Sequence, residues 1–175
     1  MHVYDDRATG MHWQIHKDGA EHFRKLGKGS KGRLPVACVI GADPATMFAA
    51  ACPLPSGLDE LMLAGFLRKK SVELVKCKTI DLEVPAEAEI VLEGYVEEGE
   101  MRLEGPFGDH TGFYSRAKDF PVFHLTCITH RKDPVYVTPV VGRPPRAACY
   151  MGKAIARILL PMSQQQFPEI TAIHL

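Results

Sequence analysis

The stretch AEIVLEGYVEEGE, residues 88–100, decides the fold. It is rich in apolar, β-branched and aromatic residues, which is the composition of a β-strand. A second stretch of this kind, FPVFHLTCITHR, follows at 120–131, and two others lie at 71–85 and 134–141. Their alternation predicts long antiparallel strands joined by short turns, among them EEGE at 97–100.

The N-terminal half has a mixed pattern. HVYD and MHWQIH, separated by the turn-rich DRATG, predict a hairpin within residues 2–16. A short helix is expected at 20–26 and a buried strand at 34–40. Asp43 is a plausible cap for a following helix, and the apolar run over 58–70 predicts another helix with a basic C-terminal end.

The last predicted element is a helix at 147–168, which Pro161 is expected to kink or end. The chain contains no internal repeat, no low-complexity tract and no evident linker. Its 175 residues are the size of one ordinary domain. The simplest prediction is therefore a single α+β domain, residues 1–175, built around a small β-barrel.

Charge and hydropathy exclude several classes of protein. Acidic and basic side chains balance at 21 each, so no net field indicates a nucleic-acid or membrane-surface protein. No apolar run approaches the roughly 20 residues needed to span a bilayer. The N-terminal residues lack the pattern of a signal peptide, and we expect a cytoplasmic protein.

The five cysteines are scattered and never form a CxxC pair. This arrangement fits neither a disulfide framework nor a zinc site. Four of them lie in apolar stretches, and we interpret these as small buried residues in a reducing compartment.

The stretch EGPFGDHTGFY, residues 104–114, sets two carboxylates five residues apart around glycine and proline. If Glu104 and Asp109 project into one cavity, repulsion and partial burial should raise one pKa. The pair would then offer one proton donor and one carboxylate, as general acid–base chemistry requires. The alternative is a solvated turn between strands, where these residue types are common.

Glu60 lies in a helix with apolar residues on every side, so its carboxylate is expected to be buried and to need a cation or several donors. His16 closes a predicted strand and is by itself more typical of a structural or exposed histidine. Together with phosphate oxygens, His16 and Glu60 would suit Mg²⁺ or Mn²⁺. The arginines of GRPPR, 142–146, could hold a phosphate or carboxylate, or lie in a solvated loop.

Five runs together resemble the UbiD family of prenylated-flavin-dependent decarboxylases. They are GMHWQIHKDGA (10–20), PVACVIGADPATMFAAACPLPSGLDELMLAGFLR (35–68), VELVKCKTIDLEVPAEAEIVLEGYVEEGEMRLEGPFGDHTGFYS (72–115), VGRPPRAACYMGKA (141–154) and QFPEI (166–170). They cover nearly the whole chain in the family's order. The blocks EIVLEG and EGPFGDHTG are the most specific of the motifs.

The resemblance implies a split β-barrel with flanking helices, similar to the FMN-binding barrels of flavin reductases. Family members are several times longer than a small domain, and this chain resembles their central part. The flanking N-terminal and C-terminal α/β domains have no counterpart in this sequence.

The resemblance also implies a metal and a flavin site. His16 and Glu60 match the residues that hold Mn²⁺, or Mg²⁺, against the phosphate of prenylated FMN or FMN, with K⁺ nearby. Glu104 and Asp109 match two acids of a Glu-Arg-Glu network. In that network Asp109 donates a proton to the product carbon, and Glu104 orients the network and tunes its charge.

Further cofactor contacts are implied by the same matches. Ala50, Ala51, Cys52 and Pro53 match backbone that passes along the flavin and its phosphate. Met151 matches a side chain near the ring system.

The family's third metal ligand, an asparagine, and its network arginine lie just before the position of Met1. Two hypotheses follow. In the first, the chain is the cofactor-binding core of a decarboxylase for aromatic or α,β-unsaturated acids, active with a partner subunit or segment that carries the missing parts. In the second, it is a stand-alone, non-catalytic flavin carrier or storage protein. A flavin reductase is a third, weaker possibility, based on analogy of the barrel.

Partners follow from the same reasoning. A flavin prenyltransferase would supply the prenylated cofactor. Surfaces that the absent domains cover in the family would be exposed, and exposed apolar patches bind partners. We therefore expect a homo-oligomer, with no nucleic acid and no membrane span.

Overall fold

The computed structural model describes residues 2–12, 18–26, 32–55 and 57–174. The chain divides into two compact units. Unit 1 consists of residues 1–105 and 117–137 and contains all the strands, whereas unit 2 consists of residues 106–116 and 138–175 and contains one long helix. The prediction of a single domain over 1–175 stays a prediction.

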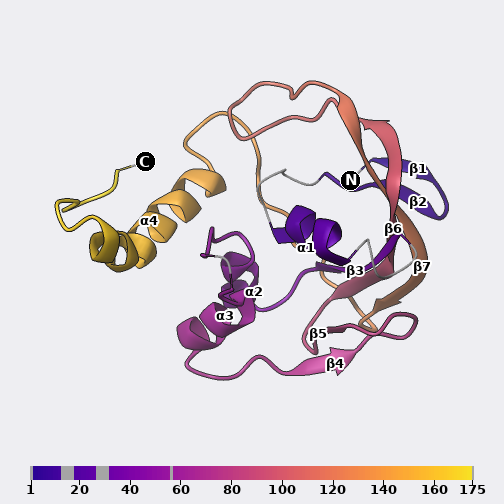
Figure 1. Cartoon of the computed structure of the whole chain (residues 1–175), viewed down its shortest axis with the longest axis horizontal. Coiled ribbons are helices and arrows are strands. Elements are labelled where there is room, and N and C mark those ends of the chain that lie inside the picture. The colour runs from indigo at the N-terminus through magenta and orange to yellow at the C-terminus, as the bar shows by residue number, and fades with distance from the viewer. Residues whose placement is uncertain (1, 13–17, 27–31, 56, 175) are drawn as a thin grey trace. The chain divides into compact units, whose positions relative to one another are not determined.

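The main sheet of unit 1 has five antiparallel strands in the order β1-β2-β7-β6-β3 (Figure 1). These strands are β1 (Val3–Asp5), β2 (Ala8–Gly10), β3 (Arg33–Ile40), β6 (Ile90–Glu104) and β7 (Lys118–His130). The predictions of strands at 88–100, 120–131 and 34–40 are confirmed. The third of these is an edge strand of the sheet, and most of its residues are only half-buried or exposed.

The turn predicted at EEGE, 97–100, is wrong. These residues form an irregularity inside β6, where the pairing with β7 shifts between Val96 and Met101. The chain cannot turn back there, because β6 is also paired with β3 as far as Glu97. Glu98 continues this pairing by donating its N–H to the carbonyl of Gly32 at 2.7 Å. Gly99, with φ of +80°, absorbs the extra length.

The core of unit 1 lies against the centre of β6 and β7. Val96, Val122 and Phe123 are all completely buried. Gly94 lies so close to the His124 carbonyl of β7 that a Cβ would collide with it. Close strand packing therefore requires glycine at this position.

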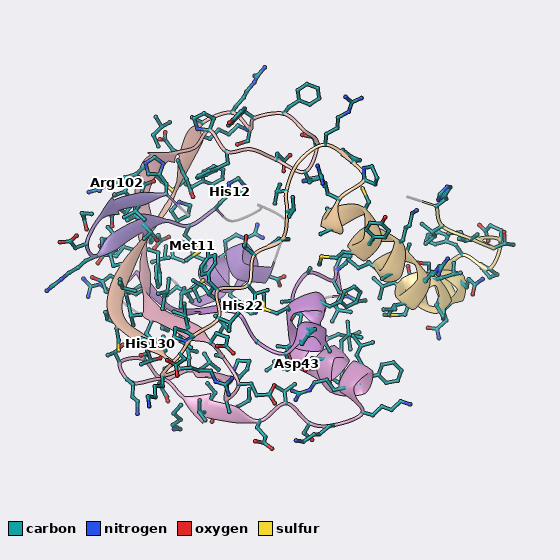
Figure 2. All side chains as sticks on the ribbon, turned by 180° about the vertical axis from the view of Figure 1, so that it is seen from behind. Met11, His12, His22, Asp43, Arg102 and His130 are labelled. Carbon is teal, nitrogen blue, oxygen red and sulfur yellow. The ribbon has the colours of Figure 1, made fainter. Side chains whose placement is uncertain are left out.

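Three helices accompany the sheet in unit 1: α1 (Asp18–Leu26), α2 (Pro44–Ala49) and α3 (Glu60–Arg68). All three were expected from the sequence. Asp43, labelled in Figure 2, caps α2 as predicted, because its carboxylate accepts the N–H of Ala45 at 2.9 Å.

Two predicted strands are shorter than expected or missing. The stretch 71–85 contributes only β4 (Leu74–Lys76) and β5 (Glu83–Pro85), which pair with each other in a separate sheet. Residues 134–141 are not in a strand, because no described segment pairs with them. Strand formation needs a partner, which local composition does not supply.

The N-terminal hairpin is tighter than predicted. It turns at Asp6 and Arg7, where the N–H of Arg7 is bound by the Asp5 carboxylate at 2.8 Å, so the second strand is Ala8–Gly10 rather than MHWQIH. Residues 13–16 of the predicted second strand lie outside the described residues.

Unit 2 contains α4 (Ala147–Gln166). Pro161 lies inside this helix, which continues to Gln166, so the proline does not end it. In the part of the chain that the structure describes, no helix combines the length and the apolar character needed to cross a membrane.

The architecture is mixed α and β with antiparallel sheets, as the α+β prediction required. Among the described strands the pairing does not close a barrel, and the split barrel stays a prediction. All five cysteines are free thiols, as expected, but Cys52 alone among them is fully buried.

Candidate functional site

Glu104, the last residue of β6, is 1% exposed, and neither carboxylate oxygen has a hydrogen-bond partner among the described residues. The phenol of Tyr4 donates to the Leu103 carbonyl at 3.1 Å. Burial first, and the nearby Glu104 charge second, raise the pKa of Tyr4. Burying a carboxylate without donors is energetically costly, and only a proton, a cation or a hydrogen-bond donor can offset that cost.

Asp109 lies in unit 2, in the loop that precedes Tyr114. Its carboxylate accepts a hydrogen bond from Nδ1 of His110 at 2.7 Å and one from the Thr111 hydroxyl at 3.3 Å. The backbone N–H of His110, followed by the His110 side chain, holds the pKa of Asp109 below its ordinary value. The loop therefore favours the carboxylate form of Asp109.

Glu104 and Asp109 belong to different units. That the two acids share one cavity stays a prediction. The raised pKa expected for one member of the pair does not occur at Asp109, because donors surround it.

Glu60, the first residue of α3, is half-buried rather than fully buried. It sits in the first turn of the helix, and later positions of that helix face solvent, with Met62 59% and Phe66 76% exposed. The Glu60 carboxylate makes no hydrogen bond or ion pair to another described residue, so it is available as a ligand. His16 lies outside the described residues. Within the described ranges no three histidine, cysteine or acidic side chains gather as a metal centre.

The segment from Ala50 to Pro53 follows α2. The N–H groups of Ala50, Ala51 and Cys52 bond to the carbonyls of Thr46, Phe48 and Ala49, respectively. They are therefore not donors for a phosphate. Ala50, Ala51 and Pro53 are exposed and offer apolar surface, which suits packing against a ring. Met151 is half-buried in α4 of unit 2.

Glu93 is a buried acid that the sequence analysis missed. It is 1% exposed and accepts the Lys78 N–H at 2.8 Å, the Thr79 N–H at 2.6 Å and the Thr79 hydroxyl at 2.8 Å. Burial opposes its ionisation, but these donors outweigh burial and lower the pKa of Glu93. The alternation of β6 was the available signal, because it puts Glu93 on the same face as buried Val91.

A second polar cluster lies on the β6–β7 pair. Nε2 of His124 and Oε2 of Glu100 are 2.5 Å apart, His124 stacks on Tyr95, and the Arg33 guanidinium lies over the Tyr95 ring at 4.4 Å. A hollow of about 590 Å³ is lined in part by Tyr95, His124 and Arg7. None of the described residues predicted to bind flavin or metal lines it.

The described residues fit a flavin and metal site in two respects. Glu60 offers an unengaged carboxylate, and the Glu104 oxygens need a donor, a cation or a proton that the described residues do not supply. The fit is poorer at Ala50–Cys52, where the backbone donors are already used.

Comparisons with known proteins place these features in a family. Residues 1–144 match the family described as UbiD: 3-octaprenyl-4-hydroxybenzoate carboxy-lyase Rift-related domain. Uncharacterized proteins of Archaeoglobus fulgidus and Aquifex aeolicus are 56% and 47% identical to this sequence over 100% of the chain. The chain covers 36% of the length of each relative.

Solved structures show the same relationship. An evolved dimeric form of the UbiD-class enzyme HmfF from Pelotomaculum thermopropionicum, in complex with prFMN, is 35% identical with a TM-score of 0.86, over 99% of this chain and 40% of that one. Vanillic acid decarboxylase from Sedimentibacter hydroxybenzoicus, in its closed form, is 29% identical with a TM-score of 0.89, over 97% of this chain and 36% of that one.

Proposed function

This chain belongs to the UbiD family, and from that premise we propose that it binds prenylated FMN or FMN as the cofactor-binding part of a decarboxylase. The substrates would be aromatic or α,β-unsaturated carboxylic acids. Support comes from the similarity to HmfF, which has been solved with prFMN and with FMN. The chain covers 36% of its relatives' length, so the activity of the whole protein is part of the proposal.

The observation that carries the proposal is the Glu104 carboxylate. It is buried, and no described residue donates a hydrogen bond to it. Stability does not explain such a group, since an unpaired buried carboxylate is destabilising. Acids with this environment are candidates for catalytic work.

The roles proposed for the individual residues are those that the resemblance to the family implies. Glu104 would orient the acid network and tune its charge, and Asp109 would deliver a proton to the product carbon. His16 and Glu60 would hold Mn²⁺ or Mg²⁺ against the phosphate, with K⁺ nearby. When bound, the flavin supplies the electron sink that decarboxylation needs.

Asp109 needs a change of environment for this role. The donors of its loop keep its pKa low, and a low pKa leaves little protonated acid near neutral pH. Closure of the site over the substrate would exclude water and favour the protonated form.

The wider assembly is also proposed. The sheet would be part of the family's split barrel, and a flavin prenyltransferase would supply the cofactor. The chain would act in the cytoplasm as a homo-oligomer or with a partner subunit. Exposed side chains such as Met62, Phe66 and Leu103 support such contacts.

The test is a titration of the purified chain with FMN and with prenylated FMN, with and without Mn²⁺. Flavin absorbance and Trp13 fluorescence report binding. We expect metal-dependent binding that weakens in His16→Ala and Glu60→Ala but not in the matched controls His22→Ala and Glu83→Ala, which alter exposed side chains. Failure of the chain to bind either flavin would refute the proposal.

Turnover of a carboxylic acid distinguishes the decarboxylase from the alternative, a non-catalytic flavin carrier or storage protein. The flavin-loaded chain, together with the partner subunit or segment that carries the missing parts, is incubated with a panel of aromatic and α,β-unsaturated acids, and release of CO₂ is measured. Release supports the decarboxylase. Tight flavin binding without release from any acid, in the presence of Mn²⁺, would favour a carrier or storage protein.

A further inference from the structure

Gly10 and Glu104 approach each other closely within unit 1. A Cβ built on Gly10 would lie 2.6 Å from Oε2 and 2.8 Å from Oε1 of Glu104, and would also collide with its Cδ. Real Cβ atoms do not come this close to another heavy atom, so the space above the Cα of Gly10 is filled by the carboxylate.

We propose that Gly10 is a positioning residue, whose lack of a side chain determines where the buried Glu104 carboxylate lies. The importance of this for catalysis rests on the proposed function. The steric contact involves only Gly10 and Glu104, which are both described residues.

Backbone conformation does not explain the glycine. The φ of Gly10 is not positive, so an L-residue could adopt its backbone conformation. Ala8, two residues earlier in β2, is also buried and carries a side chain. A glycine inside a strand weakens it and often marks a close approach, and here the approaching group is Glu104.

The backbone of Gly10 is held in place. Its N–H donates to the His2 carbonyl at 2.7 Å, and the N–H of Met11 donates to the Pro121 carbonyl at 2.9 Å. Figure 2 labels Met11 and His12, which follow directly, and His12 stacks on Phe120 with ring centroids 4.0 Å apart. A side chain at position 10 would therefore move the Glu104 carboxylate rather than the strand.

The test is a double-mutant cycle in urea unfolding, which needs no flavin. Gly10→Ala is measured in the wild-type, Glu104→Asp and Glu104→Gln backgrounds. In the wild-type background we expect the unfolding equilibrium constant to rise by about tenfold or more, the usual effect of overpacking. Aspartate withdraws the carboxylate by about 1.5 Å, one carbon–carbon bond, so there the effect should fall below about threefold.

The glutamine background separates shape from charge. Glutamine has the shape of glutamate, so Gly10→Ala should remain as harmful there as in the wild type. Gly65→Ala is the matched control, because its Cβ would meet only the Lys70 carbonyl, at an ordinary 3.6 Å. Equal effects of Gly10→Ala in all three backgrounds would overturn the proposal.

Two further outcomes are decisive. If Gly10→Ala does not fold, Gly10→Ala/Glu104→Asp should restore folding, and failure to restore it would overturn the proposal. In an NMR spectrum of folded protein with ¹³C-labelled glutamate, the carboxyl signal of Glu104 is the one that disappears in Glu104→Gln. This signal should shift in Gly10→Ala and should stay in place in Gly65→Ala. If the wild-type chain binds no flavin, the proposed function fails while the cycle still decides the role of Gly10.

Discussion

Glu93→Gln should destabilise the protein by about 3 kcal/mol near pH 7. The buried carboxylate accepts hydrogen bonds from the Lys78 N–H to both of its oxygens and from the N–H and hydroxyl of Thr79. Hydrogen bonds to a charged group contribute about 1.5–3 kcal/mol each. The uncharged amide of glutamine would accept the remaining hydrogen bonds more weakly. Its NH₂ group would replace one of the two oxygens that accept the Lys78 N–H, so that hydrogen bond would be lost completely.

The loss should depend on pH with a definite sign. The folded pKa of Glu93 is lowered, so the ionised carboxylate stabilises the protein above its unfolded pKa, about 4.3. This contribution is lost as the pH falls through the folded pKa. The difference between wild type and Glu93→Gln should therefore be largest near neutral pH and shrink in acid.

The assay is urea unfolding followed by circular dichroism, from neutral to acidic pH. Glu98→Gln is the matched control, because Glu98 lies in the same strand with an exposed side chain. A free energy of unfolding for Glu93→Gln within about 0.5 kcal/mol of wild type near pH 7, the range of ordinary surface substitutions, would contradict the stabilising role of these hydrogen bonds. An effect that grows as the pH falls would contradict it as well.

Three other substitutions test particular contacts. His110→Ala should raise the pKa of Asp109 only part of the way to its ordinary value, because the backbone N–H of residue 110, the main cause of the lowering, remains. A titration followed by the ¹³C signal of the Asp109 carboxyl measures this pKa, and an unchanged pKa would contradict the assigned contact with the His110 side chain. Gly94→Ala should prevent folding, since its Cβ would collide with the His124 carbonyl, and a native circular dichroism spectrum and melting curve would show this to be wrong. Asp59→Ala should cost about 1 kcal/mol through loss of the α3 cap, and an unchanged urea midpoint would speak against the cap.

Local patterns predicted the elements whose formation depends on their own residues. The alternation of β6 and β7 and the Asp43 cap are of this kind. Residues 134–141 have the same composition as a strand, yet they lack a partner among the described residues. Pairing depends on segments distant in sequence, so composition alone could not decide between these cases.

The burial predicted for Glu60 was wrong, and the buried Glu93 was missed, for a related reason. The run of apolar residues around Glu60 indicated burial, but α3 exposes Met62 and Phe66 to solvent. An apolar helix is buried only where something covers it, and the sequence does not say what covers α3. Glu93 could have been found, because strand alternation fixes which side chains share a face with Val91.

The two buried acids of β6 show how structure separates stability from function. Both are 1% exposed. Glu93 has donors from Lys78 and Thr79, so stability alone explains why it is there. Glu104 has no donor among the described residues, and the space for it is made by a glycine in β2. Burial without compensation makes the unfolding free energy smaller, so a carboxylate held in that state is best explained by a ligand or a reaction that needs it.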